Sequence, residues 1–303
     1  MAVTSDSLIT RVIRACRWST ESESLRPRTN ADLLAIADEI ILGTVWPTVL
    51  ALSPDYYVCT IDHALVDGYS RYRLPGRIFG PVKDVLVLDA DGNEANSNLI
   101  TLEELGRLER LAGSRMYHYI DGDYLGVEPV PGAGVTDSIR IRYFRAPSTL
   151  ALAATSTTVT ACDFETDPDE LTVDDGSVFT TGDDADVISA GSAHQVLAED
   201  IGLTVAGNVL TSDTTLLGSG VQLGDYVAPA GTTPIVQVPD HATPWLVALI
   251  ASEAMEHHDP QGSTRQAQRA AALLGNMQKI SAPRTLSEPE TLSDPLSPFE
   301  AFR

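Results

Sequence analysis

The densest group of side chains able to bind a metal lies between residues 163 and 186. Four acidic residues stand at alternate positions, as the ligands of a calcium loop do: Asp163, Glu165, Asp167 and Asp169. Pro168 occupies the sixth position, where such a loop has glycine, and no glutamate stands at the twelfth. A second acidic run, residues 183–186, follows. We interpret both as solvated loops, with a divalent cation as the alternative, and expect no metal or cofactor.

The sequence holds no motif that assembles a nucleophile and its base. It contains no G-x-S-x-G, P-loop, G-x-G-x-x-G or H-E-x-x-H pattern. His257, His258 and Asp259 are consecutive, and consecutive helical residues point about 100° apart, so a helix end explains them better than a metal site. Residues 89–94 predict a hairpin turn rather than a calcium loop. We predict no enzymatic activity, and a hydrolase site assembled from distant residues stays an open alternative.

Two groups of residues are candidates for binding a protein partner. Arg11, Arg14 and Arg17 lie off the apolar stripe of the first predicted helix, where they contact an acidic partner or face solvent. Near the C-terminus, residues 285–289 are echoed by residues 291–295, and the prolines there exclude a helix. We expect an extended arm that anchors in a partner's groove, or else a disordered terminus. The candidate anchors are Leu286, Leu292, Phe299 and Phe302.

The charge of the chain is concentrated in one stretch. The 303 residues include 42 Asp and Glu and 20 Lys and Arg, which gives a formal net charge of −22. Between Arg145 and Arg265 there is no Lys or Arg, while residues 146–264 hold 18 acidic side chains. A chain of this length suggests about two domains, and the charge marks residues 150–240 as one of them.

Composition excludes several classes of protein. Binding to nucleic acid by neutralising phosphates needs a basic surface, which this acidic chain lacks. The three cysteines, Cys16, Cys59 and Cys162, are too far apart for a zinc knuckle or a disulfide scaffold. We expect no signal peptide and no membrane span, since the longest apolar run, residues 33–52, contains Asp38, Glu39 and Pro47.

Helical patterns lie at both ends of the sequence and strand patterns lie between them. Apolar spacing predicts a helix over residues 5–18, a second from Asn30 to a kink or stop at Pro47, and two more from Thr243 and after Pro260. Alternating and β-branched runs predict strands from residue 56 to 144. Short runs between turn residues predict a small antiparallel barrel or sandwich over residues 150–240.

These patterns indicate an α+β protein. We expect a helical bundle formed by the N- and C-terminal helices, with an inserted antiparallel β barrel or sandwich and an extended C-terminal arm. The expected domains are a mixed core of residues 1–149 and 241–282, an acidic β-rich domain of residues 150–240, and the arm, residues 283–303.

Four strings, taken in order, resemble the head–tail connector proteins (portal adaptor or neck proteins) of tailed bacteriophages. They are Tyr72-Arg73-Leu74-Pro75 followed by Arg77, Ile139 to Ser148, Leu223 to Val227, and Thr233 to Pro239 leading into the helix of Trp245. The strings and that helix span about residues 55–280. Each string is structural rather than catalytic, so the resemblance rests on their order.

The resemblance implies a structural virion protein of the neck, made in the cytoplasm of the bacterial host. It implies a ring, of twelve subunits, docked on the portal protein and joined to tail or tail-terminator proteins, with no catalysis. DNA would pass through without sequence-specific binding, and the C-terminal arm would reach onto the portal. The alternative is a calcium-binding, acidic β-rich adhesin or tail-fibre module.

Overall fold

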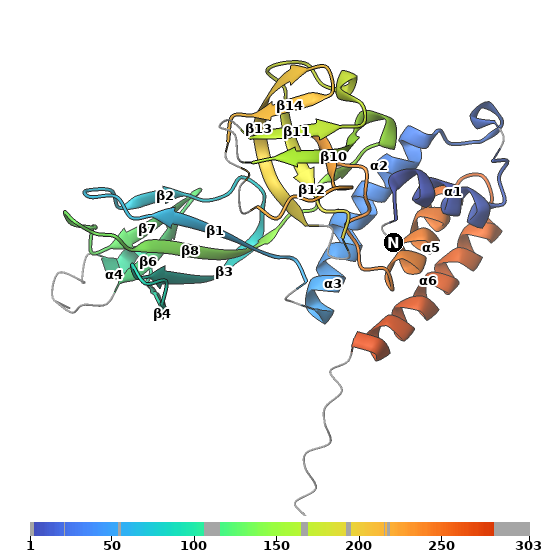
Figure 1. Cartoon of the computed structure of the whole chain (residues 1–303). Coiled ribbons are helices and arrows are strands. Elements are labelled where there is room, and N and C mark those ends of the chain that lie inside the picture. Colours follow the sequence, from blue (N-terminus) through green and yellow to red (C-terminus); the bar gives the residue numbers. More distant parts are fainter. Residues whose placement is uncertain are drawn as a thin grey trace, which may run out of the picture.

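The computed structural model has helices at both ends of the chain and two β regions between them (Figure 1). It describes residues 3–20, 22–53, 56–105, 116–164, 169–191, 195–214, 216 and 219–281. The predicted α+β class with an inserted barrel is confirmed. The predicted C-terminal arm lies outside the described residues. The helices form one layered unit, the helical body: α1 (Ser5–Cys16), α2 (Asn30–Ile40), α3 (Trp46–Leu52), α5 (Thr243–Met255) and α6 (Pro260–Ser281).

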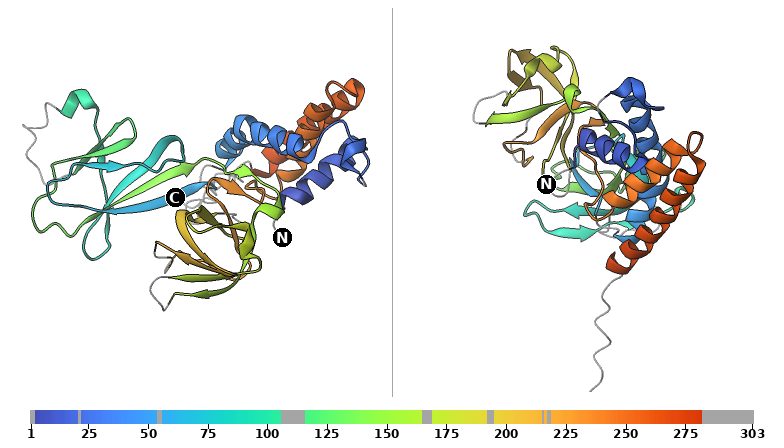
Figure 2. Two further views of the ribbon diagram at one scale, coloured as in Figure 1. Left: turned by 90° about the horizontal axis from the view of Figure 1, so that it is seen from above. Right: turned by 90° about the vertical axis from the view of Figure 1, so that its right-hand side faces the viewer.

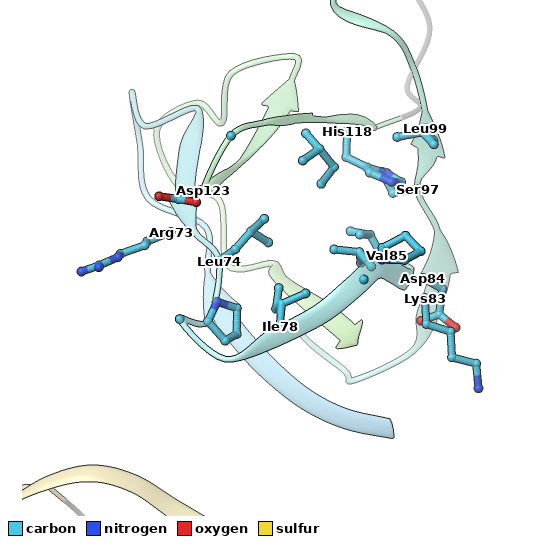
Figure 3. Close-up of a pocket in the computed structure, with 17 residues that line it drawn as sticks. Arg73, Leu74, Ile78, Lys83, Asp84, Val85, Ser97, Leu99, His118 and Asp123 are labelled. Carbon is cyan, nitrogen blue, oxygen red and sulfur yellow. The ribbon is translucent and has the colours of Figure 1, made fainter. Parts of the chain in front are cut away.

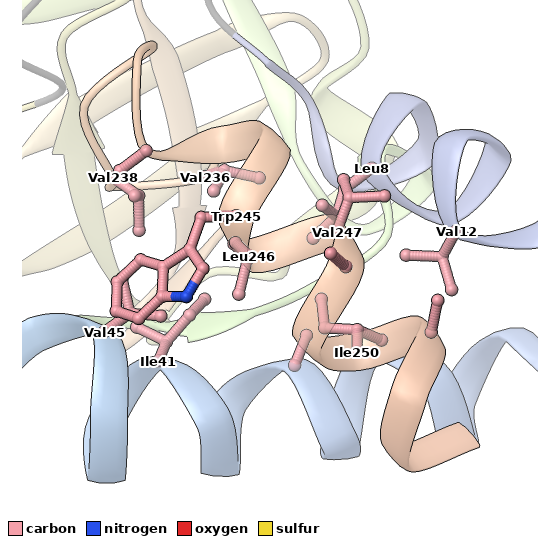
Figure 4. Close-up of a cluster of buried hydrophobic side chains, with 14 of the residues drawn as sticks. Leu8, Val12, Ile41, Val45, Val236, Val238, Trp245, Leu246, Val247 and Ile250 are labelled. Carbon is pink, nitrogen blue, oxygen red and sulfur yellow. The ribbon is translucent and has the colours of Figure 1, made fainter. Parts of the chain in front are cut away.

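Helix α5 is the centre of the helical body. It is apolar all round, and Leu246 and Ile250 have no exposed surface. Figure 4 shows Leu8 and Val12 of α1 on one side of it and Ile41 on the other. Because α5 lies between helices from the N-terminal end and α6, the two ends of the chain share one hydrophobic core, as the sequence predicts.

The starts of the N-terminal helices are capped by threonines. Thr4 Oγ1 accepts a hydrogen bond from the backbone N–H of Ser7 at 3.2 Å. Helix α2 is capped by Thr29 rather than by Asn30, because Thr29 and Asp32 exchange side-chain to backbone hydrogen bonds of 2.9 and 3.1 Å in a capping box.

Pro47 does not end the second helix. A π-helical turn, Ile41–Val45, joins α2 to α3, and the N–H of Trp46 bonds to the carbonyl of Ile41 five residues earlier. The wider turn accommodates a proline ring that would clash with the carbonyl four residues before it. The resulting helix, Asn30–Leu52, is long and apolar enough to cross a membrane. Its buried side chains face the core shared with α5, as those of a core helix in a globular protein do.

The residues from 58 to 145 form a two-sheet unit, here called the wing (Figure 1). One sheet has the order β1-β8-β3-β4: β1 (Val58–Ala64), β8 (Ser138–Arg145), β3 (Ile78–Leu88) and β4 (Glu94–Asn96). The other has the order β2-β7-β6-β5: β2 (Arg71–Arg73), β7 (Tyr124–Glu128), β6 (Tyr117–Asp121) and β5 (Asn98–Leu99), followed by α4 (Leu102–Leu105). Leu125, Val127, Ile139 and Ile141 are buried between the sheets.

The acidic stretch folds as a closed antiparallel barrel rather than a sandwich. Its order is β10-β11-β14-β13-β12-β15: β10 (Thr157–Asp163), β11 (Glu170–Val173), β14 (Val209–Ser212), β13 (Val196–Ala206), β12 (Asp184–Ile188) and β15 (Tyr226–Pro229). A turn in which Gly207 has a left-handed φ of 65° joins β13 to β14. Leu171, Val187 and Leu210 fill the interior with no exposed surface.

The two chain segments that enter and leave the barrel lie side by side. β9 (Thr149–Leu150) pairs in parallel with β16 (Thr232–Thr233). The N–H of Leu150 donates to Asp38 Oδ1 of α2 at 2.8 Å, and the N–H of Ser5 donates to the carbonyl of Pro234 at 2.8 Å. The barrel is therefore fixed to the helical body at its base, while the wing projects in another direction (Figure 2).

Candidate functional site

Two arginines of the wing reach across to the barrel and form an ionic joint. Arg77, just before β3, binds Asp186 through Nη1 and Asp200 Oδ1 through Nη2 at 2.6 Å. Arg145, the last residue of β8, binds Glu199 through Nε and Ser148 Oγ through Nη1 at 3.1 Å. Its Nη2 lies 3.7 Å from Asp186 Oδ2. We call these five charged residues the joint.

Asp186 is the centre of the joint and has no exposed surface. Its Oδ1 accepts from the backbone N–H of Asp200 at 3.1 Å, and its Oδ2 accepts from Gly231 N–H at 3.0 Å besides Arg77. Burial alone would lower the pKa of Arg77, but the hydrogen bond and charge of Asp186, helped by Asp200 and Glu199, raise it. A carboxylate removed from water needs such partners. The burial of Asp186 therefore requires that the wing lie against the barrel.

The alternation of β8 explains how one strand supplies buried and exposed arginines. Residues 139, 141, 143 and 145 face inward and residues 138, 140, 142 and 144 are half-buried on the other face. Arg145 therefore occupies a position that the pattern reserves for an apolar side chain. It is also the last Lys or Arg before 119 residues that contain neither. These two signals mark Arg145, although the sequence prediction did not use them.

A wide cleft opens between the two sheets of the wing. Its volume is about 1050 Å³, and Figure 3 shows Leu74, Ile78, Val85 and His118 directed into it. Leu99 and Ile120 also line it and remain 67% and 38% exposed. Apolar side chains line most of its interior and charged ones, such as Arg73 and Asp123, lie at its edge, so it has the character of a sandwich core that is not completely filled.

The cleft contains a serine–histidine pair that bears on the hydrolase alternative. Ser97 Oγ lies 2.9 Å from His118 Nδ1 and donates to the carbonyl of Met116 at 3.3 Å. A catalytic triad also needs a third group, usually a carboxylate, bonded to the other ring nitrogen of the histidine. None of the described residues supplies such a carboxylate to His118. Burial lowers the pKa of His118, and the pair connects β5 and β6.

The acidic loops considered as calcium sites are occupied by other contacts. Asp183 Oδ2 accepts from the N–H and the hydroxyl of Thr180 at 2.8 and 3.0 Å, and Asp186 belongs to the joint. Asp89 accepts from the backbone of Asp91 and Asn93, as the predicted hairpin turn requires. Among the described residues no group of three His, Cys, Asp or Glu side chains has metal-binding geometry. Residues 165–168 lie outside the described part.

The structure places one of the two predicted partner-binding groups. Arg11, Arg14 and Arg17 are all exposed on α1, opposite the face that Leu8 and Val12 bury. Arg17 ends the helix with a left-handed φ of 59°, and its N–H bonds to the carbonyl of Arg14 at 3.1 Å. The other group, Leu286, Leu292, Phe299 and Phe302, lies outside the described residues.

The sequence was compared with protein families and with curated proteins. A family model described as SU10 adaptor protein matches residues 7–194. The match covers α1 to α3, the whole wing and the barrel as far as β12. It therefore includes both arginines of the joint and Asp186. No curated protein matches the chain.

Proposed function

The chain belongs to the SU10 adaptor protein family, and from this premise we propose that it forms a ring docked on the portal and joins the phage head to the tail. The family makes it a structural protein of a phage virion. The finer assignment, a neck ring of twelve copies that forms part of the DNA channel, is our proposal. It is supported by the order of the connector-like strings in the sequence.

The structural observation that carries the proposal is the division of one subunit into three connected bodies. The helical body closes around α5, while the wing and the barrel project from it in different directions (Figure 2). Each body has its own hydrophobic cluster and presents its own surface. An adaptor between two larger assemblies needs separate surfaces for each of them and for its own copies.

The charge of the barrel suits a conduit for DNA. Residues 157–229 contain 14 acidic side chains and no Lys or Arg. Acidic surfaces repel phosphates, so a duplex passing them is not held by counterion release. In this proposal the DNA passes without sequence-specific binding.

The partner contacts complete the proposal. Arg11, Arg14 and Arg17 contact an acidic protein surface, and the segment that carries Leu286, Leu292, Phe299 and Phe302 anchors on the portal. The division into residues 1–149 with 241–282, residues 150–240 and residues 283–303 also stays a proposal. Synthesis in the host cytoplasm follows from the phage origin.

The direct test is cryo-electron microscopy of virions, or of the portal incubated with the purified full chain. The expected result is a ring of this protein under the portal with a central opening that admits a DNA duplex. A density located at a fibre tip, or no ring on the portal, would contradict the proposal. A variant that ends at residue 282 should keep the far-ultraviolet spectrum of the full chain and bind the portal more weakly.

A further inference from the structure

Opposite charges are separated onto different elements of the subunit. Residues 5–17 and 260–281, which contain α1 and α6, hold six basic side chains and one acidic side chain, Asp6. The basic ones are Arg11, Arg14, Arg17, Arg265, Arg269 and Lys279. Residues 157–229, which contain the barrel, hold no Lys or Arg. A chain with a net charge of −22 therefore carries two helices with an excess of basic side chains, and their exposed surface is here called the α1/α6 face.

The two helices of this face are joined and hollowed between their exposed arginines. Gln266 Nε2 donates to the carbonyl of Ala15 at 3.0 Å, which ties α6 to α1. A hollow of about 230 Å³ lies beside this bond, lined by Arg17, Arg265 and Arg269 among other residues. Gln266 Oε1, which also borders it, is buried without a hydrogen-bond partner in the described part of the chain. Asp259 lines the hollow too, and its Oδ1 accepts from the N–H of Gly262 at 2.9 Å. The hollow thus presents three guanidinium groups, one carboxylate and one unused acceptor.

The arginines of the face are largely unused within the subunit. Arg265 Nη2 is 3.8 Å from Asp259 Oδ2, and both side chains are more than half exposed. For Arg11, Arg14, Arg17 and Arg269 the described residues provide no ion pair. Such charges are available to another molecule.

The barrel also keeps carboxylates that its own subunit does not neutralise. The joint occupies Asp186, Glu199 and Asp200. Asp174 and Asp184 remain exposed, and within the described residues their carboxylates accept no hydrogen bond and form no ion pair. The α1/α6 face lies on the side of the helical body that points away from the wing (Figure 1).

We propose that the α1/α6 face docks against the acidic barrel of a second copy of this chain, whose carboxylates enter the hollow between Arg17, Arg265 and Arg269. The inference rests on the proposed ring. In a ring of identical subunits, each interface joins two different surfaces of neighbouring copies, head to tail. A subunit with one basic face and one acidic body supplies two such surfaces that attract each other.

Local attraction and overall repulsion act over different distances. Each copy carries −22, but charges farther apart than about 10 Å are screened at 0.1 M salt. Contacts between arginines and carboxylates at the interface are closer than that and partly desolvated, so they are screened less. The paired faces therefore set the orientation of neighbouring subunits, while salt screens the repulsion between their net negative charges.

A charge-swap experiment tests the inference with full-length protein. R265E/R269E places two carboxylates beside the hollow, and D174K/D184K places two cations on the barrel, so each variant alone opposes like charges at these positions. When the two variants are mixed, they can alternate around a ring with an even number of subunits. Every contact then joins opposite charges again, glutamates to lysines at one interface and arginines to aspartates at the next. R71E/R73E changes two exposed wing arginines and is the control with the same net charge as R265E/R269E. Circular dichroism checks that all variants fold.

Rings are counted by negative-stain electron microscopy on portal assemblies at 0.1 M salt. We expect each interface variant alone to lose about tenfold in ring yield, the mixture to recover to within about twofold, and the control to match the unmodified chain. Normal rings from both variants alone would overturn the inference and leave the proposed function standing. Equal loss in the mixture also overturns it and indicates an acidic portal surface or DNA as the occupant. No rings from the unmodified chain would overturn the proposed function itself.

Discussion

Strand β8 supplies arginines to two ionic clusters that differ in their surroundings. Arg145 enters the joint, where its side chain is 6% exposed and Asp186 is not exposed at all. Arg140, five residues earlier, lies on the outer face of the wing and binds Asp62 Oδ2 at 2.8 Å and Glu94 Oε1 at 2.7 Å. In both clusters an arginine binds carboxylates of other strands, but only the outer cluster is accessible to water.

This difference determines what each cluster does for the protein. Water competes for exposed charges, so an outer cluster such as that of Arg140 adds little to stability. A buried carboxylate that loses its partner stays uncompensated, which is strongly destabilising. The joint therefore holds the wing and the barrel together. The outer cluster lies on one sheet of the wing and joins no two bodies.

Removing the buried arginine should have the largest effect. In R145M the Met side chain keeps most of the apolar volume, while Asp186 and Glu199 lose a cation. We expect a loss of about 3 kcal/mol in the free energy of unfolding, measured by urea denaturation followed by fluorescence. R142A, on the outer face of the same strand, is the control. A loss equal to that of the control would remove the distinction between the clusters.

Neutralising the buried carboxylate as well should recover part of that loss. D186N removes the charge that Arg145 balances, while its amide oxygen can still accept from Arg77 and Gly231. Its amide nitrogen cannot accept from the N–H of Asp200, so the recovery is partial. We expect R145M/D186N to be more stable than the sum of the single changes predicts, with a coupling of about 1–3 kcal/mol. The double-mutant cycle measures this term. Simple additivity would show that the joint is not an electrostatic unit.

Asp38 provides an intermediate case, because it is half-buried and no cation among the described residues pairs with it. Burial raises its pKa to about 6, although the N–H of Leu150 binds it. The folded state therefore holds the proton more tightly than the unfolded state, so this stability is present below about pH 4 and is lost as pH rises through about 6. D38N should be more stable than the unmodified chain at pH 7.5, by less than about 1 kcal/mol after solvent screening.

Thermal unfolding at two pH values checks this prediction. At pH 4 the unmodified Asp38 is largely protonated, so D38N should bring no advantage there. A stabilisation of equal size at both pH values would assign the effect to packing and not to the buried charge.

Breaking the outer cluster should have the smallest effect. Hydrogen bonds to Asp62 and Glu94 raise the pKa of Arg140, so it stays charged throughout the usual pH range. In R140A the two carboxylates return to water, and we expect a melting temperature close to that of the unmodified chain in 0.15 M salt. Differential scanning calorimetry measures it. A shift as large as that of R145M would contradict the comparison.

Periodicity along the chain predicted the elements of the fold. The stripe of Leu8 and Val12, the apolar helix after Thr243 and the alternation of residues 138–144 all correspond to observed elements. In α6 the apolar residues at helical spacing do not all face the core, since Ala270 and Met277 are buried but Ala267 and Ala271 are exposed. Small side chains satisfy a helical period on more than one face, so the period alone does not select the buried one.

The joint and the cleft did not follow from local patterns. Arg77 and Asp186 are 109 residues apart, and their contact depends on how the wing is placed against the barrel. Likewise, the spacing of Ser97 and His118 gave no sign that β5 and β6 would bring them together. Local preference determines strands and helices, whereas such pairs depend on the arrangement of whole bodies.

The central position of α5 sets an order for folding during synthesis. The wing and the barrel are each built from one continuous stretch of chain, so each can assemble as soon as it has left the ribosome. Helices α1 and α2 are synthesised first, but they bury their apolar faces against α5, which follows more than 200 residues later. They must wait with those faces exposed until residue 255 has emerged. The helices that are synthesised first therefore find their packing partner only near the end of synthesis.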